Sequence, residues 1–179
     1  MCLARTARTF CLIASLLPFV TLVRAATDDP ANFVAWRAGL SSSAQPNAAF
    51  LKRVKLLGYD VVINLAPPEY DEAVQNEGAI LAAQGVTYLN IPVQFGNPTP
   101  DDFRIFTDVL KSVAKKKVLV HCQINLRGSS FTYLYRVITE SASEDAERRK
   151  LTGVWMPNPT WKQFIENVLG ASGKKVELL

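Results

Sequence analysis

The sequence predicts an α/β protein with a central, mostly parallel sheet flanked by helices on both faces. Two observations and one general rule lead to this prediction. Apolar runs of strand length occur at residues 60–66, 87–93 and 117–121. Segments whose apolar residues are spaced three and four apart, as on one face of an amphipathic helix, separate and follow these runs. Strands that are apolar throughout are buried on both faces, which is typical of parallel sheets covered by helices.

The N-terminal part of this fold contains one strand and one helix. A short edge strand is predicted over residues 33–37, and residues 39–46 are rich in turn-forming residues. A helix is predicted over residues 47–57 and ends at Gly58. Its apolar residues share one face, as a helix that packs on a sheet requires. They are Phe50, Leu51, Val54 and Leu57.

Two helices connect the three apolar runs. The first is predicted near residues 72–84 and ends at Gly85. The second has Thr99 as its N-cap, Pro100 in its first position and Asp102 in its third, which is an ordinary helix start. Its apolar positions are Phe103, Phe106, Leu110 and Val113.

Two helices follow the last apolar run. The first is predicted to begin at about Gly128, and its apolar positions are Phe131, Leu134, Tyr135 and Ile138. The final helix is predicted over residues 160–169, with Trp161, Phe164, Ile165 and Val168 on its apolar face. The large aromatic residues of this region, Tyr133, Tyr135, Trp155 and Trp161, are expected to pack in the core.

The first 25 residues are predicted to be a secretory signal peptide. Arg5 and Arg8 form a basic start, residues 10–23 are an apolar run, and Val23-Arg24-Ala25 fits a small-residue cleavage site. The apolar run is shorter than the roughly 20 residues that span a bilayer, so no stable membrane insertion is expected after cleavage. Residues 26–179 are expected to form a single domain in the periplasm or outside the cell.

Charge and cysteine content exclude several classes of function. The leader carries three Arg and no acid, so without it 17 basic residues face 16 acidic ones, and no basic stripe suggests a nucleic-acid partner. Cys2 and Cys11 leave with the leader, so Cys122 remains alone and no internal disulfide forms. One Cys beside one His cannot supply the three or four ligands of a zinc site, and no cofactor is expected.

The candidate site lies at the end of the run 117–121. Ligands of such sheets bind beyond the carboxyl ends of the strands, where the loops 66–72, 94–101 and 122–128 are expected to meet. The last strand ends at His121 and delivers Cys122 to this edge. The free N–H groups of the following helix and the nearby Arg127 favour the thiolate and suit an oxyanion ligand. His121 is expected to be a hydrogen-bonded core residue that orients the loop.

This stretch resembles the active-site loop of the protein tyrosine and dual-specificity phosphatases, in which His-Cys is followed by five residues and Arg. More narrowly, the chain resembles the bacterial phosphatase-like family related to the domain fused to β-lactamase-like hydrolases. The resemblance spans residues 32–169 and rests on several motifs taken together. They are AQP (44–46), GYDVVINL (58–65), YLNIPVQFGNPT (88–99), HCQINLRGSSFTYLYRV (121–137) and VWMPNPTWKQFI (154–165).

The resemblance implies a phosphatase-like fold and a role for each residue of the loop. Cys122 would be the nucleophile that forms a phosphocysteine intermediate, and Arg127 would bind the phosphoryl oxygens and stabilise the transition state. The phosphate-binding loop would comprise Gln123, Ile124, Asn125, Leu126, Arg127, Gly128 and Ser129. Asn125 stands where the larger superfamily has Gly, and Asn is a residue that tolerates a left-handed backbone. By analogy, Ser129 would hydrogen-bond the sulfur.

Two departures from the phosphatase pattern leave alternatives open. The region about thirty residues before the cysteine, where phosphatases carry an Asp general acid, ends in Gln94. Other acidic residues are candidates for this role: Asp101, Asp102, Glu69, Asp71 and Glu72. Only four residues separate Cys122 from Arg127, which is the spacing of rhodanese-type sulfurtransferases, and their persulfide chemistry needs no acid.

The function expected first is hydrolysis of phosphate monoesters, with a phosphorylated protein or a small molecule as substrate. Sulfur transfer through a persulfide on Cys122 is the second expectation. A non-catalytic module that only binds anions is the third, because a phosphatase fold does not by itself determine the reaction.

Overall fold

A five-stranded sheet forms the centre of the computed structural model, which describes residues 29–69 and 74–174. The strand order is β1-β2-β5-β3-β4, and β1 alone runs antiparallel to its neighbour. The strands are β1 (Val34–Arg37), β2 (Leu40–Ser43), β3 (Val61–Asn64), β4 (Thr87–Asn90) and β5 (Val118–His121). The predicted α/β class with a mostly parallel sheet is therefore confirmed, and the edge strand predicted at 33–37 corresponds to β1.

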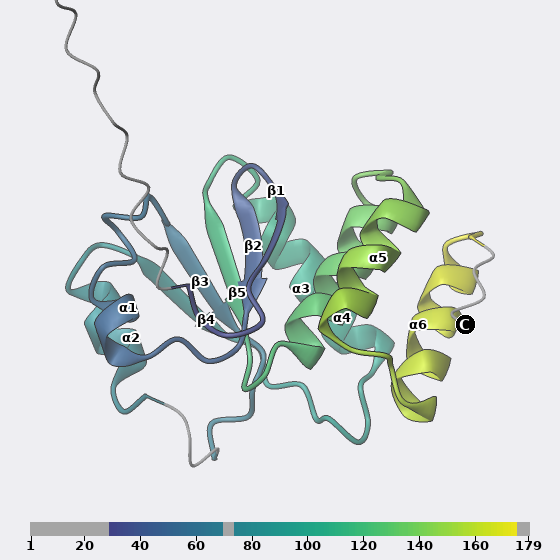
Figure 1. The fold of residues 1–179 in the computed structure, drawn as a ribbon, viewed down its shortest axis with the longest axis horizontal. Helices are drawn as coiled ribbons and strands as arrows, with labels where there is room; N and C mark the ends of the chain where they lie inside the picture. The colour runs from purple at the N-terminus through teal and green to yellow at the C-terminus, as the bar shows by residue number, and fades with distance from the viewer. Residues whose placement is uncertain (1–28, 70–73, 175–179) are drawn as a thin grey trace, which may run out of the picture.

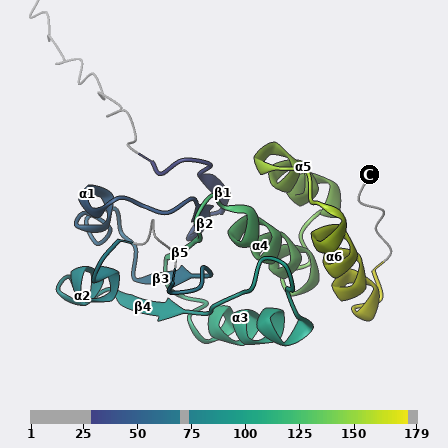
Figure 2. The same ribbon diagram turned by 90° about the horizontal axis from the view of Figure 1, so that it is seen from below.

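Helices cover both faces of the sheet, as predicted (Figures 1 and 2). On one face lie α1 (Ala48–Leu51) and α2 (Glu77–Ala82). On the other lie α3 (Pro100–Ser112) and α4 (Leu126–Ile138). The last two helices, α5 (Glu144–Val154) and α6 (Pro159–Ala171), pack against α4. None of the helices in the described parts of the chain is long and apolar enough to span a bilayer.

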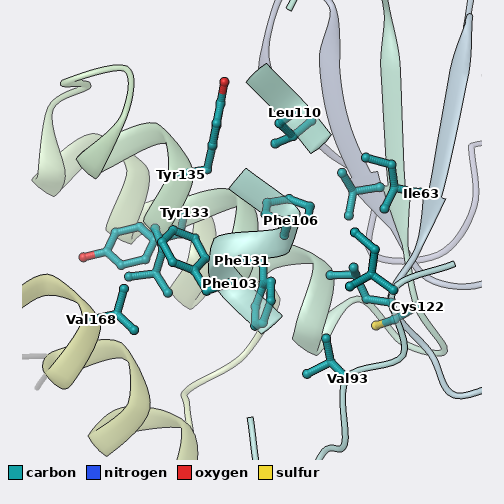
Figure 3. Packing of buried hydrophobic residues seen from close by; sticks show 14 of the residues in the cluster. Ile63, Val93, Phe103, Phe106, Leu110, Cys122, Phe131, Tyr133, Tyr135 and Val168 are labelled. Carbon is teal, nitrogen blue, oxygen red and sulfur yellow. The ribbon is translucent and has the colours of Figure 1, made fainter. Parts of the chain in front are cut away.

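The core consists of two clusters of buried apolar residues, one on each face of the sheet, and successive residues of a strand belong to different clusters. Val61 and Ile63 of β3 belong to the cluster that includes side chains of α3, α4 and α6, whereas Val62 between them belongs to the cluster that includes side chains of α1 and α2. In β5, Val120 belongs to the first cluster and Leu119 to the second. Successive side chains of a strand point to opposite faces, and both faces are buried here, so the strands have to be apolar throughout. Figure 3 shows part of the larger cluster.

The structure contains one strand and one helix that the sequence did not predict. The stretch expected to be turn-rich contains β2, whose sequence LSSS is fully buried. Its serine hydroxyls have partners: Ser42 Oγ accepts from Trp36 Nε1 at 2.9 Å, and Ser41 Oγ lies 2.7 Å from the hydroxyl of Tyr59. Helix α5 was not predicted at all. Its sequence EDAERRKLTGV buries Leu151 as its one large apolar side chain and therefore carries almost no apolar periodicity.

Four helices begin or end at other residues than predicted, and α6, at Pro159–Ala171 instead of 160–169, differs by only one and two residues. Helix α1 ends at Leu51 and continues as turns to Gly58, although Phe50, Leu51 and Val54 are buried as expected. Helix α2 begins at Glu77, and positions 72 and 73 of its predicted range lie outside the described residues. Helix α4 begins at Leu126 and not at Gly128, so Arg127 belongs to its first turn. The predicted signal peptide also lies outside the described residues.

Candidate active site

Cys122 follows β5 directly and lies at the carboxyl edge of the sheet. Its side chain is fully buried, and its backbone N–H donates to the carbonyl of Ser43 at the end of β2. Figure 3 shows the sulfur at the margin of the larger core cluster, in the same part of the view as Val93. The strand register fixes this position, because β5 is paired with β2 on one side and β3 on the other. The nucleophile candidate is thus held by the centre of the sheet.

A cavity of about 180 Å³ opens at this edge, and Cys122 and Arg127 both line it. The other residues of its wall are Phe95, Gln123, Ile124 and Leu126. Two of the three loops expected to meet here therefore do so: the loop after β4 supplies Phe95, and the loop after β5 supplies the rest. The loop after β3 contributes Pro67 and Pro68 to a different cavity, which is also lined by Glu77 and Tyr88.

The backbone around this cavity presents a row of unused hydrogen-bond donors. In the described part of the chain, none of the backbone N–H groups of residues 123–128 donates to an acceptor. The first three residues of α4 belong to this row, and the side chain of the N-cap Asn125 makes no capping bond to them. More than nine in ten buried backbone N–H groups are paired in folded proteins. Six consecutive unpaired donors at the positive end of a 13-residue helix form a site that suits an anion.

Arg127 is held in place by three neighbours. Its Nε donates to the carbonyl of Val93 at 2.8 Å, and its Nη1 donates to Oε1 of Gln123 at 3.0 Å. Its guanidinium carbon lies 5.2 Å from the ring centre of Phe95, a cation–π distance. Nη2 of Arg127 donates to no acceptor among the described residues. The side chain is buried yet has no acidic partner in the described residues, so its positive charge is free to attract an anion in the cavity.

Asn125 and Gly128 shape the loop from behind the cavity. Asn125 has φ 71° and ψ 9°, the left-handed conformation expected for it. Its side chain is fully buried, and Nδ2 donates to the carbonyl of Asn32 at 2.6 Å. A Cβ on Gly128 would lie 2.6 Å from Oδ1 of Asn125, closer than such atoms approach in proteins. The absence of a side chain at Gly128 therefore allows the Asn125 amide to fill this space.

Ser129 and Ser130 lie in the first turns of α4. Both are fully buried, and the hydroxyls of Ser129 and Ser130 donate to the carbonyl of Leu126 at 3.2 Å and 2.8 Å. The backbone N–H of Ser129 donates to the carbonyl of Asn125, which is the first intrahelical bond. Neither serine side chain lines the cavity.

His121 points to the opposite face of the sheet from Cys122. The imidazole is fully buried, and its Nε2 lies 2.9 Å from Oε1 of Glu77, whose side chain is 4% exposed. The two atoms are at ion-pair distance but poorly aligned for a hydrogen bond. His121 is therefore a core residue, as expected, but the hydrogen bond expected of it is not formed among the described residues: the contact with Glu77 joins the end of β5 to α2 by proximity alone.

The acidic residues considered as proton donors lie away from the cavity, where the structure describes them. Asp102 is engaged in the capping box of α3 with Thr99, as the sequence predicted. Asp101 contacts Arg104 on the surface, and Glu69 is exposed. Asp71 and Glu72 lie outside the described residues. Gln94 is exposed, and no acidic residue is among the described residues that line the cavity.

Sequence reasoning missed two residues of the site. Phe95 forms one wall and stacks on Arg127, and its carbonyl accepts from Trp161 Nε1 of α6 at 2.8 Å. An aromatic residue in the otherwise polar stretch QFGN was the available signal. Asn32 reaches the loop from a distance of more than 90 residues in sequence, and nothing in its local pattern indicated this.

A family model and several solved structures match this chain. The model of the phosphatase-like domain of Beta-lactamase hydrolase-like protein matches residues 32–138, from just before β1 to the end of α4. The matched segment contains Cys122 and Arg127. No curated protein compared with the chain matches it.

Among the solved structures, a DUF442 protein from Shewanella putrefaciens CN-32 has 30% identity and a TM-score of 0.73, over 80% of this chain and 94% of that one. The core catalytic domain of the PP-IP phosphatase SIW14 from S. cerevisiae has 19% identity and a TM-score of 0.61, over 80% and 94%. TpbA from P. aeruginosa, in a complex with phosphotyrosine, has 18% identity and a TM-score of 0.62, over 79% and 88%. The latter two share the fold with this chain.

Proposed function

This chain belongs to the family of phosphatase-like domains of Beta-lactamase hydrolase-like proteins, as its motifs predicted, and we propose that it hydrolyses phosphate monoesters at Cys122. One observation carries the proposal. Cys122 and Arg127 line one cavity at the carboxyl edge of the sheet, and the loop around it, residues 123–128, carries N–H groups that have no acceptor among the described residues. A phosphoryl group placed there would meet a sulfur nucleophile and donors for its oxygens.

The reaction proceeds in two displacements at phosphorus. In the first, the thiolate of Cys122 attacks, the phosphorus–oxygen ester bond breaks, and the leaving oxygen takes a proton from solvent. In the second, water attacks the phosphocysteine, the phosphorus–sulfur bond breaks, and inorganic phosphate leaves as the thiolate re-forms. Arg127 and the backbone donors stabilise the charge on the phosphoryl oxygens in both transition states.

The substrate class follows from the residues that line the cavity. None of the described lining residues is acidic, so none of them can give the leaving oxygen a proton. Esters of acidic alcohols, such as phenols, therefore react faster than esters of aliphatic alcohols. Phe95, Ile124 and Leu126 add apolar wall to the cavity, which suits an aryl group. We accordingly propose aryl phosphates, on a protein or a small molecule, as substrates.

Kinetics with an aryl phosphate test the proposal. Cys122→Ser should lower the rate of phosphate release at least about 1000-fold, because the hydroxyl is a far weaker nucleophile at neutral pH. Arg127→Lys should lower it about 100-fold, because an ammonium cannot present the planar fork. A Cys122→Ser protein that releases phosphate at the wild-type rate rules out the mechanism.

Sulfur transfer is the second candidate, and two observations favour it. Four residues separate Cys122 from Arg127, and the cavity is small and has no acid among its described lining residues. In that reaction Cys122 would take a sulfane sulfur from thiosulfate, releasing sulfite, and pass it from the persulfide to a thiol acceptor. The same Cys122→Ser control applies, with sulfide production as the readout. A protein that gives neither product but binds oxyanions would be an anion-binding module.

We further propose that residues 1–25 direct export and are then removed. The basic start, the apolar run and the small residues at Val23-Arg24-Ala25 support this. Mass spectrometry of the protein expressed in a bacterium should find a periplasmic form that begins at Ala26. An intact N-terminus on protein that stays in the cytoplasm would contradict it.

A further inference from the structure

The N-terminal segment of the described chain is joined to the loop that follows Cys122. Asn32 Nδ2 donates to the carbonyl of Ile124 at 2.9 Å, and Asn125 Nδ2 donates to the carbonyl of Asn32 at 2.6 Å. Each asparagine thus binds the backbone of the other's segment, and we call this reciprocal pair the Asn32–Asn125 clasp. Both residues have a left-handed backbone, with φ 52° and φ 71°. The left-handed backbone at both residues accompanies a close approach of the two segments, which both hydrogen bonds require.

The segment after β2 binds both the loop and the N-terminal segment. The N–H of Gln45 donates to the carbonyl of Gln123 at 2.9 Å, and the N–H of Ala44 donates to the carbonyl of Ala31 at 2.8 Å. Two successive loop carbonyls, those of Gln123 and Ile124, are therefore occupied by partners outside the loop. The first bond comes from a backbone next to the sheet, whereas the second depends on a single side chain, that of Asn32.

The orientation of these carbonyls decides where the following N–H groups point. In a planar trans peptide the C=O of one residue and the N–H of the next point in opposite directions. When the carbonyl of Ile124 is turned toward Asn32, the N–H of Asn125 is turned away from it. Likewise, the carbonyl of Gln123 is turned toward the N–H of Gln45, so the N–H of Ile124 is turned away from Gln45. Both N–H groups belong to the row of donors that lack an acceptor in the described residues.

We propose that Asn32 is a positioning residue for anion binding at this site. It does not line the cavity, and it acts by holding the peptide between Ile124 and Asn125 in the orientation that presents its N–H to an oxyanion. The inference rests on the proposed function only in so far as the cavity binds an oxyanion. The loop is one residue shorter than the phosphatase pattern. The side-chain amide of Asn32, which lies outside the loop, fixes the orientation of the peptide that follows Ile124.

Tungstate binding, measured by calorimetry, tests the proposal without any turnover. Asn32→Gly keeps the left-handed backbone and the carbonyl that accepts from Asn125, and it removes only the amide. Loss of one neutral hydrogen bond that fixes the binding-competent loop should raise the dissociation constant for tungstate about fivefold. Asn32→Asp should raise it further, because a carboxylate cannot donate to Ile124 and repels the anion.

Asn76→Gly is the matched control. Asn76 also has a left-handed backbone, with φ 60°, is exposed, and makes no side-chain capping bond at the start of α2. Both substitutions add the same freedom to the unfolded chain and place Gly at a left-handed position, so these two effects cancel in the comparison, and only Asn32→Gly also loses a hydrogen bond. Only Asn32→Gly should weaken tungstate binding.

The outcomes separate this inference from the proposed function. If Asn32→Gly binds tungstate as tightly as the wild type, the inference is wrong, whatever the enzyme does with phosphate esters. If Asn76→Gly weakens binding equally, the effect is general loosening and the inference is also wrong. If tungstate binding falls only in the Asn32 variants while no ester is hydrolysed, the clasp stands and the hydrolytic proposal fails. A wild-type protein that binds no tungstate contradicts both.

Discussion

Single residues determine the shape of the anion site, and Gly128 is the most constrained of them. Gly128→Ala would place a Cβ 2.6 Å from Oδ1 of Asn125, whose amide is tied to Asn32 and cannot swing away freely. We expect a loss of about 1–3 kcal/mol in the free energy of unfolding, as for other overpacked sites. Tungstate affinity should fall as well, since the clash moves the loop. Urea unfolding and calorimetry measure the two effects.

Gly153→Ala is the control for this substitution. Gly153 lies in α5 and a Cβ there would meet no other atom within 4 Å. The change should stabilise the protein by up to about 1 kcal/mol, because Ala is the better helix former. An unchanged stability of Gly128→Ala would show that the Asn125 side chain does not fill this space.

The role of a single residue could be predicted where it follows from the motif around that residue, and not where it depends on contacts with distant segments. Asn125 was expected to be left-handed because the resemblance places it where the larger phosphatase superfamily has Gly, and its φ of 71° confirms this. The spacing of Cys122 and Arg127 around a strand end placed them on one cavity. Asn32 and Phe95 could not be assigned, because their contacts depend on how distant segments meet at the sheet edge.

Among the elements, the antiparallel edge strand β1 is linked to the end of α4 by Glu140. Arg37 Nε donates to both carboxylate oxygens of Glu140 at 3.0 Å, and Arg136 contributes a further bond. Burial raises the pKa of the Glu140 carboxyl, but the hydrogen bonds from Arg37 and Arg136 outweigh this and hold the pKa below its usual value. Glu140→Gln should therefore lower the free energy of unfolding by about 1 kcal/mol at pH 7, after allowance for solvent screening.

The pH dependence of this effect follows from the sign of the shift. A carboxyl whose pKa is lowered by folding stabilises the protein fully above its unfolded value, 4.5, and loses this contribution as the pH falls through the folded value. The difference between wild type and Glu140→Gln should thus be constant above about pH 5 and shrink below pH 4.5. Glu166→Gln, which removes one 3.9 Å surface contact with Lys162, should change stability by at most about 0.5 kcal/mol. A Glu140→Gln effect that does not shrink in acid would contradict the account.

Most elements could be predicted because their cause is a pattern of apolar residues, and the exceptions lack one. Strand β2 is built from serines whose hydroxyls are satisfied by Trp36 and Tyr59, partners that no local pattern reveals. Helix α5 is held by charges: its first turn is acidic, and Glu147 contacts Arg136 of α4 and Lys150. The pair with Arg136 forms only after the two helices have come together, so apolar periodicity alone could not predict α5.

Across the whole molecule, both ends of the described chain converge on the site. Asn32 reaches the loop from the N-terminal side, and α6 reaches it from the C-terminal side through Trp161, beyond the segment that the family model matches. Trp161 is fully buried, and its Nε1 donates to the carbonyl of Phe95. The wall of the cavity is thus supported by a helix far from Cys122 in sequence.

Trp161→Phe tests this support. The change removes the bond to Phe95 and leaves a small cavity, so we expect a loss of about 1–3 kcal/mol in the free energy of unfolding and a several-fold higher KM for an aryl phosphate. Trp155→Phe is the matched control, because the Trp155 ring contacts the Phe95 ring at 6.0 Å between centroids but its Nε1 has no hydrogen-bond partner among the described residues. A similar rise in KM for both variants would show that the hydrogen bond from Trp161 is not what holds the wall.

The chemical state of Cys122 during turnover shows whether its sulfur is the nucleophile. The enzyme would be mixed with an aryl phosphate, quenched in acid within one turnover, digested, and analysed by mass spectrometry. The account predicts a phosphoryl group on the sulfur of Cys122 in the wild type and none in Cys122→Ser. Phosphate release with Cys122 unmodified throughout, or a phosphoryl group on another residue, would contradict it.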